Sequence, residues 1–199
     1  GEMFWDSGNT GSATLNKNVT TYDAAIKHSG NYSAKLQSQY VALFGIGAFA
    51  AGNIFVGKFL KIDGTDGILR FGRPFTSRPS KLVLYYRYVA GTVDYSTLGE
   101  LPKNSKDMGS IYIALGDWPH QTFDGETDIP VLVKTKPADR QLFDSNSSNV
   151  IGYGECILKE STEGEGLIKL EIPINYRSNR KPTDIILVGS ASRYGDYFT

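Results

Sequence analysis

Cysteine, histidine and net charge are all scarce in this sequence of 199 residues. The one cysteine, Cys156, can form no disulfide within the chain and no cysteine metal cluster. The two histidines, His28 and His120, lie far apart and lack the spacing of metal ligands. These shortages exclude a disulfide scaffold and leave few groups for nucleophilic catalysis.

The charges balance, because 21 basic side chains face 21 acidic ones. Nucleic-acid binding and polybasic attachment to membranes both depend on clustered positive charge, so the composition argues against both. Residues 41–57 contain no charged side chain, but this stretch is borderline in length for a membrane span and is interrupted by glycines. We therefore expect buried strands there and no transmembrane segment.

Helical periodicity is nearly absent, whereas short strand-like runs recur between clusters of Gly, Pro, Asn, Asp and Ser. We expect strands at residues 12–15, 33–40, 52–59, 67–71, 81–90, 110–115, 131–134, 151–159, 167–174 and 184–192. We also expect short helical turns at 22–27 and 138–143, and a long polar loop at 117–128. About ten strands with frequent turns predict a single all-β domain over residues 1–199, a jelly-roll sandwich of two mostly antiparallel sheets.

Acidic side chains leave two possibilities open. Glycoside hydrolysis needs two suitably separated carboxylates, and the candidates are Asp117, Asp124, Glu126 and Glu155. Scattered acids are normal on any protein surface, so we predict no catalytic residues. A structural calcium ion is possible, and its candidate ligands are Asp6, Asp23 and Asp63. No other cofactor is expected.

Tyrosines and charged residues predict a sugar-binding face. Side chains alternate between the two faces of a strand, and in residues 82–89, 111–115 and 153–159 this alternation places a tyrosine on the wetter face. Aromatic faces suit the C–H face of a sugar ring, and charged groups suit its hydroxyls. If the strands are neighbours, one concave surface would contain Tyr85, Arg87, Tyr112, Tyr153 and Glu155, with a wall made by Trp118 and His120. The alternative is an ordinary solvated face with tyrosines as strand formers.

Six stretches point to a known family. They are Trp5-Asp6-Ser7-Gly8-Asn9, His28-Ser29-Gly30-Asn31-Tyr32-Ser33-Ala34-Lys35-Leu36, Ala51-Gly52-Asn53-Ile54-Phe55-Val56-Gly57, Gly72-Arg73-Pro74-Phe75-Thr76-Ser77-Arg78-Pro79, Tyr85-Tyr86-Arg87-Tyr88, and Gly189-Ser190 through Tyr194-Gly195-Asp196-Tyr197-Phe198-Thr199. On these stretches, which span nearly the whole chain in order, the sequence resembles the PCMD family of carbohydrate-metabolism domains. The stretch that begins at His28 also resembles strands of galactose-binding-like carbohydrate modules.

The resemblance implies a jelly roll in exported or cell-surface, outer-membrane-anchored lipoproteins of glycan-foraging bacteria. It implies no particular reaction and assigns no catalytic residues. The chain opens at Gly1, as a mature start would after loss of an export signal. Family members usually continue beyond the Tyr-Phe-Thr end into a closing strand with an acidic residue. We expect that strand, and with it a terminal calcium ligand, to be missing from this sequence, which stops at Thr199.

We therefore expect a non-catalytic module that binds oligo- or polysaccharides. One alternative is a structural module that binds a protein partner in a surface assembly, which would need a large exposed apolar patch. The other is a glycoside hydrolase, which would need a deep cleft with two facing carboxylates.

Overall fold

The structure is a computed structural model that describes residues 3–43, 46–94, 96 and 101–198. Its strands are β1 Trp5–Asp6, β2 Thr20–Asp23, β3 Ser33–Leu36, β4 Gln39–Leu43, β5 Ile46–Ala50, β6 Asn53–Asp63, β7 Asp66–Phe71, β8 Arg73–Pro74, β9 Lys81–Tyr86, β10 Gly109–Gly116, β11 Gln121–Phe123, β12 Glu126–Ile129, β13 Val131–Lys134, β14 Val150–Leu158, β15 Ile168–Pro173, β16 Asn175–Tyr176 and β17 Asp184–Ser190. Its helical turns are α1 Asn9–Ser12 and the 3-10 turns Ala13–Leu15, Pro137–Asp139 and Gly195–Tyr197.

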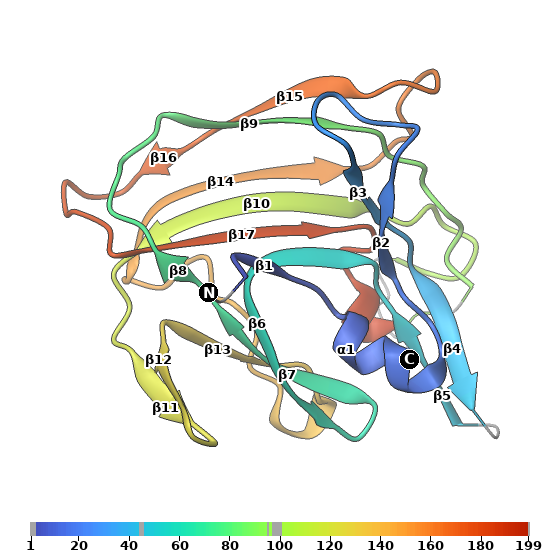
Figure 1. Cartoon of the computed structure of the whole chain (residues 1–199), viewed down its shortest axis with the longest axis horizontal. Helices are drawn as coiled ribbons and strands as arrows, with labels where there is room; N and C mark the ends of the chain where they lie inside the picture. The colour runs from blue at the N-terminus through green and yellow to red at the C-terminus, as the bar shows by residue number, and fades with distance from the viewer. Residues whose placement is uncertain (1–2, 44–45, 95, 97–100, 199) are drawn as a thin grey trace.

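One large antiparallel sheet forms the centre of the molecule. Its strand order is β13-β7-β6-β17-β10-β14-β16, with β1 added beside β6 and β8 beside β17. The long strands β17, β10 and β14 lie side by side, while β6, β7 and β13 curve away from them (Figure 1). Three separate hairpins, β2–β3, β4–β5 and β11–β12, surround this sheet.

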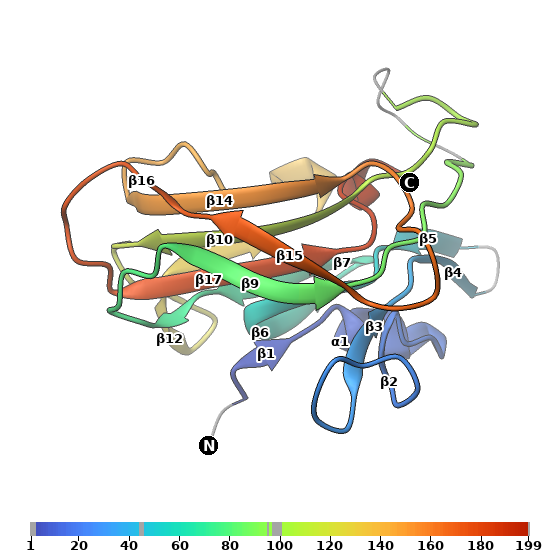
Figure 2. The same ribbon diagram turned by 90° about the horizontal axis from the view of Figure 1, so that it is seen from above.

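A second layer, made of β9 and β15, covers one face of the large sheet (Figure 2). Side chains of β9 alternate as predicted, with Leu82 and Leu84 half-buried and Val83 and Tyr85 exposed. Leu82 packs against a buried cluster of the large sheet that includes Ile113. The prediction of an all-β sandwich is thus confirmed, and the hydrophobic side of each strand is what joins the two layers.

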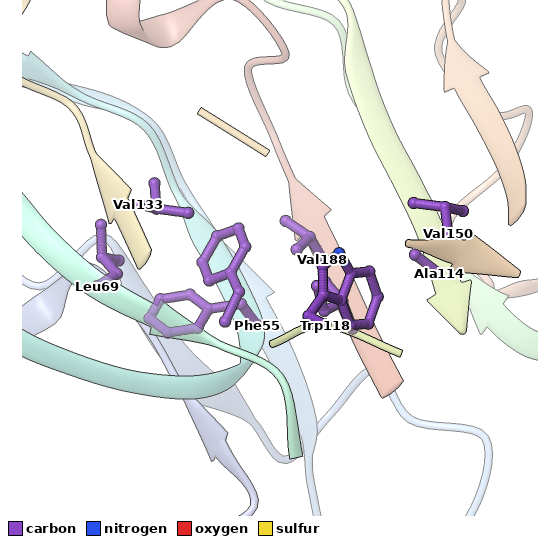
Figure 3. Close-up of a cluster of buried hydrophobic side chains, with 9 residues drawn as sticks. Phe55, Leu69, Ala114, Trp118, Val133, Val150 and Val188 are labelled. Atoms are coloured by element: carbon purple, nitrogen blue, oxygen red, sulfur yellow. The ribbon is translucent and has the colours of Figure 1, made fainter. Parts of the chain in front are cut away.

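The opposite face of the large sheet carries a second core. Phe55, Val188 and Ala114 lie on neighbouring strands of this face, and Trp118 packs over them (Figure 3). Trp118 can lie this close because the strand ends in glycine: a Cβ atom on Gly116 would sit 2.3 Å from the indole ring. The Trp118 side chain therefore packs back onto the sheet, while its neighbours Asp117 and Pro119 are exposed.

Three local expectations were wrong. The helical turn expected at residues 22–27 does not form, because β2 continues to Asp23 and residues 24–27 are not helical. Residues 12–15 are helical, because the amides of Gly11 and Ser12 both donate to the carbonyl of Gly8, and left-handed Asn16 ends the turn. Residues 117–128 are not one loop, since they contain the β11–β12 hairpin, whose tight turn uses positive φ at Asp124 and Gly125. The uncharged stretch 41–57 contributes to β4, β5 and β6, and the described residues include no helix long and apolar enough to cross a membrane.

Candidate functional site

Three of the predicted site residues do share one face of the large sheet. Tyr112 lies opposite Glu155 on β14, and Tyr153 lies two residues from Glu155 on the same strand, opposite Ala114. The Tyr112 ring stacks on Phe143, with centroids 5.4 Å apart, so its phenol is removed from water and its pKa rises. Glu155 forms an ion pair with Arg193. This face is therefore partly covered by its own neighbours.

The other predicted residues lie elsewhere. Tyr85 and Arg87 are in or next to β9, on the outer side of the second layer, and His28 stacks on the Tyr85 ring at a centroid distance of 3.5 Å. Trp118 does lie near Tyr112 and Tyr153, which pack against the same cluster, but it is only 7% exposed and is part of the core, so it offers no exposed wall. The single concave surface does not form, because alternation reports the face of a strand but not the sheet that contains it. Sugar binding by any of these residues stays a prediction.

A cleft of about 650 Å³, called here the Tyr40 cleft, lies between the β4–β5 hairpin and the segment 91–94. It is lined by Ser38, Gln39, Tyr40, Phe49, Gly91, Thr92, Val93, Asp94, Asp107 and Phe198. Tyr40 is 64% exposed and lies opposite Phe49 across the hairpin. Phe49 in turn packs edge-on against buried Phe198, with ring centroids 5.2 Å apart, which anchors the hairpin to the body.

A buried carboxylate, that of Asp107, lines the same cleft. Its Oδ1 accepts a hydrogen bond of 2.7 Å from the Met108 amide, and its Oδ2 accepts one of 2.5 Å from Ser192 Oγ. Ser192 Oγ lies 2.7 Å from Ser38 Oγ, which also accepts from the Gly52 amide. Because the carboxylate only accepts, the hydroxyl protons point along this chain toward Asp107. Burial of the carboxylate raises the pKa of Asp107.

A second cleft, of about 400 Å³, is called here the His120 cleft. It is lined by Arg70, Gly72, Arg73, Pro74, His120, Gly125, Glu126, Thr127, Asp128, Pro130 and Asp184. His120 Nε2 lies 3.0 Å from Oδ2 of the buried Asp184. His120, one of the predicted site residues, thus lies in a cleft that differs from the tyrosine face. The lining residues of this cleft are mostly polar, and they include no aromatic ring other than the imidazole.

The four candidate carboxylates of a glycosidase all lie beside cations. Glu126 accepts from Arg70 and Lys58, at 2.9 and 2.7 Å. The other ion pairs are Asp117 with Arg180, Asp124 with Lys61 and Glu155 with Arg193. Each of the four is therefore engaged by a basic side chain of the chain itself, whereas the acid of a glycosidase faces the bond that it cleaves.

The candidate calcium ligands also have partners within the chain. Asp6 accepts from the amides of Ser7 and Phe59, Asp23 accepts from two amides in its own loop, and Asp63 pairs with Lys136. Within residues 3–43, 46–94, 96 and 101–198, no group of three or more His, Cys, Asp or Glu side chains is placed to hold a metal ion.

Sequence reasoning missed the Tyr40 cleft. The lining residues come from segments that are far apart in the sequence. Only folding brings Gln39 and Tyr40 near Thr92 and Asp107. The available signal was a lone tyrosine beside glutamine at the start of an uncharged stretch that otherwise indicates burial.

Known proteins show where this fold recurs. A crystal structure from Bacteroides thetaiotaomicron, titled a putative glycoside hydrolase, is similar with a TM-score of 0.66 and 22% identity over 98% of this chain. A second crystal structure, of a putative glycoside hydrolase from Bacteroides vulgatus, is similar with a TM-score of 0.65 and 21% identity over 96% of this chain. The chain spans 57% of the first protein and 78% of the second. At these sequence identities, the similarity shows a shared fold and nothing about function.

No curated protein matches this sequence. The family described as "Putative carbohydrate metabolism domain" matches over residues 1–199, which confirms the resemblance seen in the sequence and its relation to carbohydrate. The chain belongs to this family, PCMD.

Proposed function

We propose that this domain is a non-catalytic carbohydrate-binding module and that the Tyr40 cleft holds the sugar. One observation supports this above all: an exposed aromatic ring, Tyr40, stands in a cleft that also contains the buried carboxylate of Asp107. Pockets of about 300–1,000 Å³ accommodate small ligands, and about 650 Å³ falls within this range.

Each lining group has a use in sugar recognition. The Tyr40 ring offers a flat apolar face for the C–H face of a sugar ring. Asp107 still has acceptor capacity, because each carboxylate oxygen can accept more than the one hydrogen bond it has here. Asp94 and Thr92 add a carboxylate and a hydroxyl at the rim. The platform is a single ring, so we expect affinities in about the micromolar-to-millimolar range.

The alternatives lead to different expectations. The similar crystal structures carry titles of putative glycoside hydrolases, and hydrolysis would require a protonated acid facing a second carboxylate. The ion pairs of Asp124, Glu126 and Glu155 support binding over catalysis. A cell-surface location, expected from the family resemblance, would place the module where polysaccharides are met, and a protein partner there remains the alternative ligand.

Replacing Tyr40 tests the platform. Tyr40→Ala should weaken binding of the glycan selected on an array by about fivefold, since stacking of one ring contributes about 1 kcal/mol. The thermal midpoint should hardly change, because the side chain is mostly in solvent. Tyr22→Ala is the matched control, because Tyr22 is 73% exposed on the β2–β3 hairpin and outside the cleft. Equal loss in both variants, or in neither, would contradict the assignment.

The affinity for the glycan should also depend on pH. Burial raises the pKa of Asp107 above the ordinary value of an aspartate. Ligand hydroxyls donate to the ionised carboxylate, so affinity should be complete at neutral pH and fall as the pH drops through this raised value. Calorimetric titrations between about pH 7 and pH 4 measure the effect. Asp107→Asn should bind weakly with a flat pH profile; a wild-type affinity that is constant with pH would remove Asp107 from the site.

A further inference from the structure

Asp184 is a carboxylate with no exposed surface, at the start of β17 and in the wall of the His120 cleft. Its Oδ2 accepts from Thr183 Oγ1 at 2.7 Å and from His120 Nε2 at 3.0 Å. Its Oδ1 is buried and has no hydrogen-bond partner among the described residues. Burying a carboxylate oxygen without a donor is costly, so the wall of this cleft has an acceptor that a ligand donor would satisfy, directly or through a water.

His120 adds a second acceptor. An ionised Asp184 can only accept, so the hydrogen bond between them places the proton of a neutral imidazole on Nε2. The other nitrogen, Nδ1, is then an acceptor that faces the cleft, 4.0 Å from Oδ1 of Asp128. The His120 side chain is 37% exposed and that of Asp128 is 85% exposed, so an entering ligand can reach both.

The acids beside His120 differ from Glu126 in their partners. The carboxylates of Glu126, Asp128 and Asp184 line the cleft together with the guanidinium groups of Arg70 and Arg73. Glu126 accepts from Arg70 at 2.9 Å and from Lys58 at 2.7 Å, so its charge is already balanced. The contacts of Asp128 and Asp184 are with His120 and with threonine hydroxyls, so these two carboxylates are the ones that a ligand ammonium would meet.

We propose that the His120 cleft is a second saccharide site and that it takes a hexosamine with a free amino group. The ammonium supplies both the positive charge and the donors that Asp128, Asp184 and His120 lack, and the ring hydroxyls supply further donors. A volume of about 400 Å³ lies at the low end for small-molecule pockets and suits a single sugar ring. This site is distinct from the Tyr40 cleft, because the two share no lining residue.

The test compares a tetramer of β-1,4-linked glucosamine with the same tetramer fully N-acetylated, by calorimetry at about pH 6, where more of the sugar amines carry a proton than at neutral pH. Wild type should bind the free-amine tetramer at least about tenfold more tightly, as expected for one charge-assisted hydrogen bond. Asp128→Asn and Asp184→Asn should each abolish this preference. Asp139→Asn, an exposed acid outside the cleft, should preserve it and controls for net charge.

Asp128 is largely exposed, so Asp128→Asn keeps the test decisive even if Asp184→Asn fails to fold. Equal affinity for the two tetramers would overturn the proposal, and so would a preference that survives Asp128→Asn. Tyr40→Ala separates the two sites: it should leave the free-amine preference unchanged, and a lost preference in this variant would move the hexosamine to the Tyr40 cleft and overturn the assignment. Failure of the Tyr40 proposal alone would instead appear as Tyr40→Ala having no effect on any glycan.

Discussion

Trp118→Ala should destabilise the domain by about 3–5 kcal/mol, the range for removing a large aromatic side chain from a core. Trp118 is 7% exposed and lies in the cluster of Phe55, Ala114 and Val188 (Figure 3). Its indole also meets the Phe143 ring at a centroid distance of 6.3 Å. The cavity left by the indole could not collapse, because it is bounded by the backbone of β10 at Gly116.

Urea unfolding measures this loss, and the same substitution at the other tryptophan is the matched control. Trp5 is 42% exposed on the short strand β1, so Trp5→Ala should cost about 1 kcal/mol or less. The sequence instead predicted Trp118 in the wall of a sugar-binding face, a position from which its removal would cost little stability. A Trp118→Ala variant with an unchanged midpoint and no glycan binding would restore that interpretation.

Gly52→Ala should have the second-largest effect, about 3 kcal/mol of stability together with the loss of binding at the Tyr40 cleft. A Cβ atom at Gly52 would lie 2.3 Å from the Gln37 nitrogen and 2.7 Å from the Leu36 carbonyl carbon, both backbone atoms that cannot rotate away. The chain between β3 and β4 would therefore move outward, and Ser38 Oγ would lose its bond from the Gly52 amide.

The control for this backbone clash is Gly166→Ala. A Cβ atom there meets nothing within 4 Å, so the midpoint should change by about 0.5 kcal/mol at most. If Gly52→Ala unfolds at the same urea concentration as Gly166→Ala, the backbone at Gly52 does not lie as close to Leu36 and Gln37 as the structure has it. If it loses stability but keeps full affinity, the cleft does not depend on the position of Ser38.

Strand positions followed well from the sequence because they depend on local alternation. In β9 the exposed and half-buried side chains alternate as expected, and β10 lies within one residue of its expected start. Residues 12–15 went wrong because a helical turn of this length has no periodicity to detect, only the contacts of Gly8 and Asn16. Those contacts depend on backbone geometry and not on hydrophobicity.

The candidate site was less predictable, since it depends on pairing between distant segments. The expected face brought Tyr112 and Tyr153 together, because β10 and β14 are in fact neighbours. It failed for Tyr85, because β9 pairs with β15 in the other layer. Nothing local in the sequence places Asp107 beside Tyr40, so the Tyr40 cleft required the fold.

The most direct measurement is an amide NMR titration of the domain with the strongest glycan from an array. Saturable shifts should concentrate on the residues that line the Tyr40 cleft, Ser38, Gln39, Tyr40, Thr92 and Asp107. Shifts centred on Tyr112 and Tyr153 would instead support the sheet face predicted from the sequence. The absence of saturable shifts with any array glycan would contradict carbohydrate binding by this domain and turn attention to a protein partner.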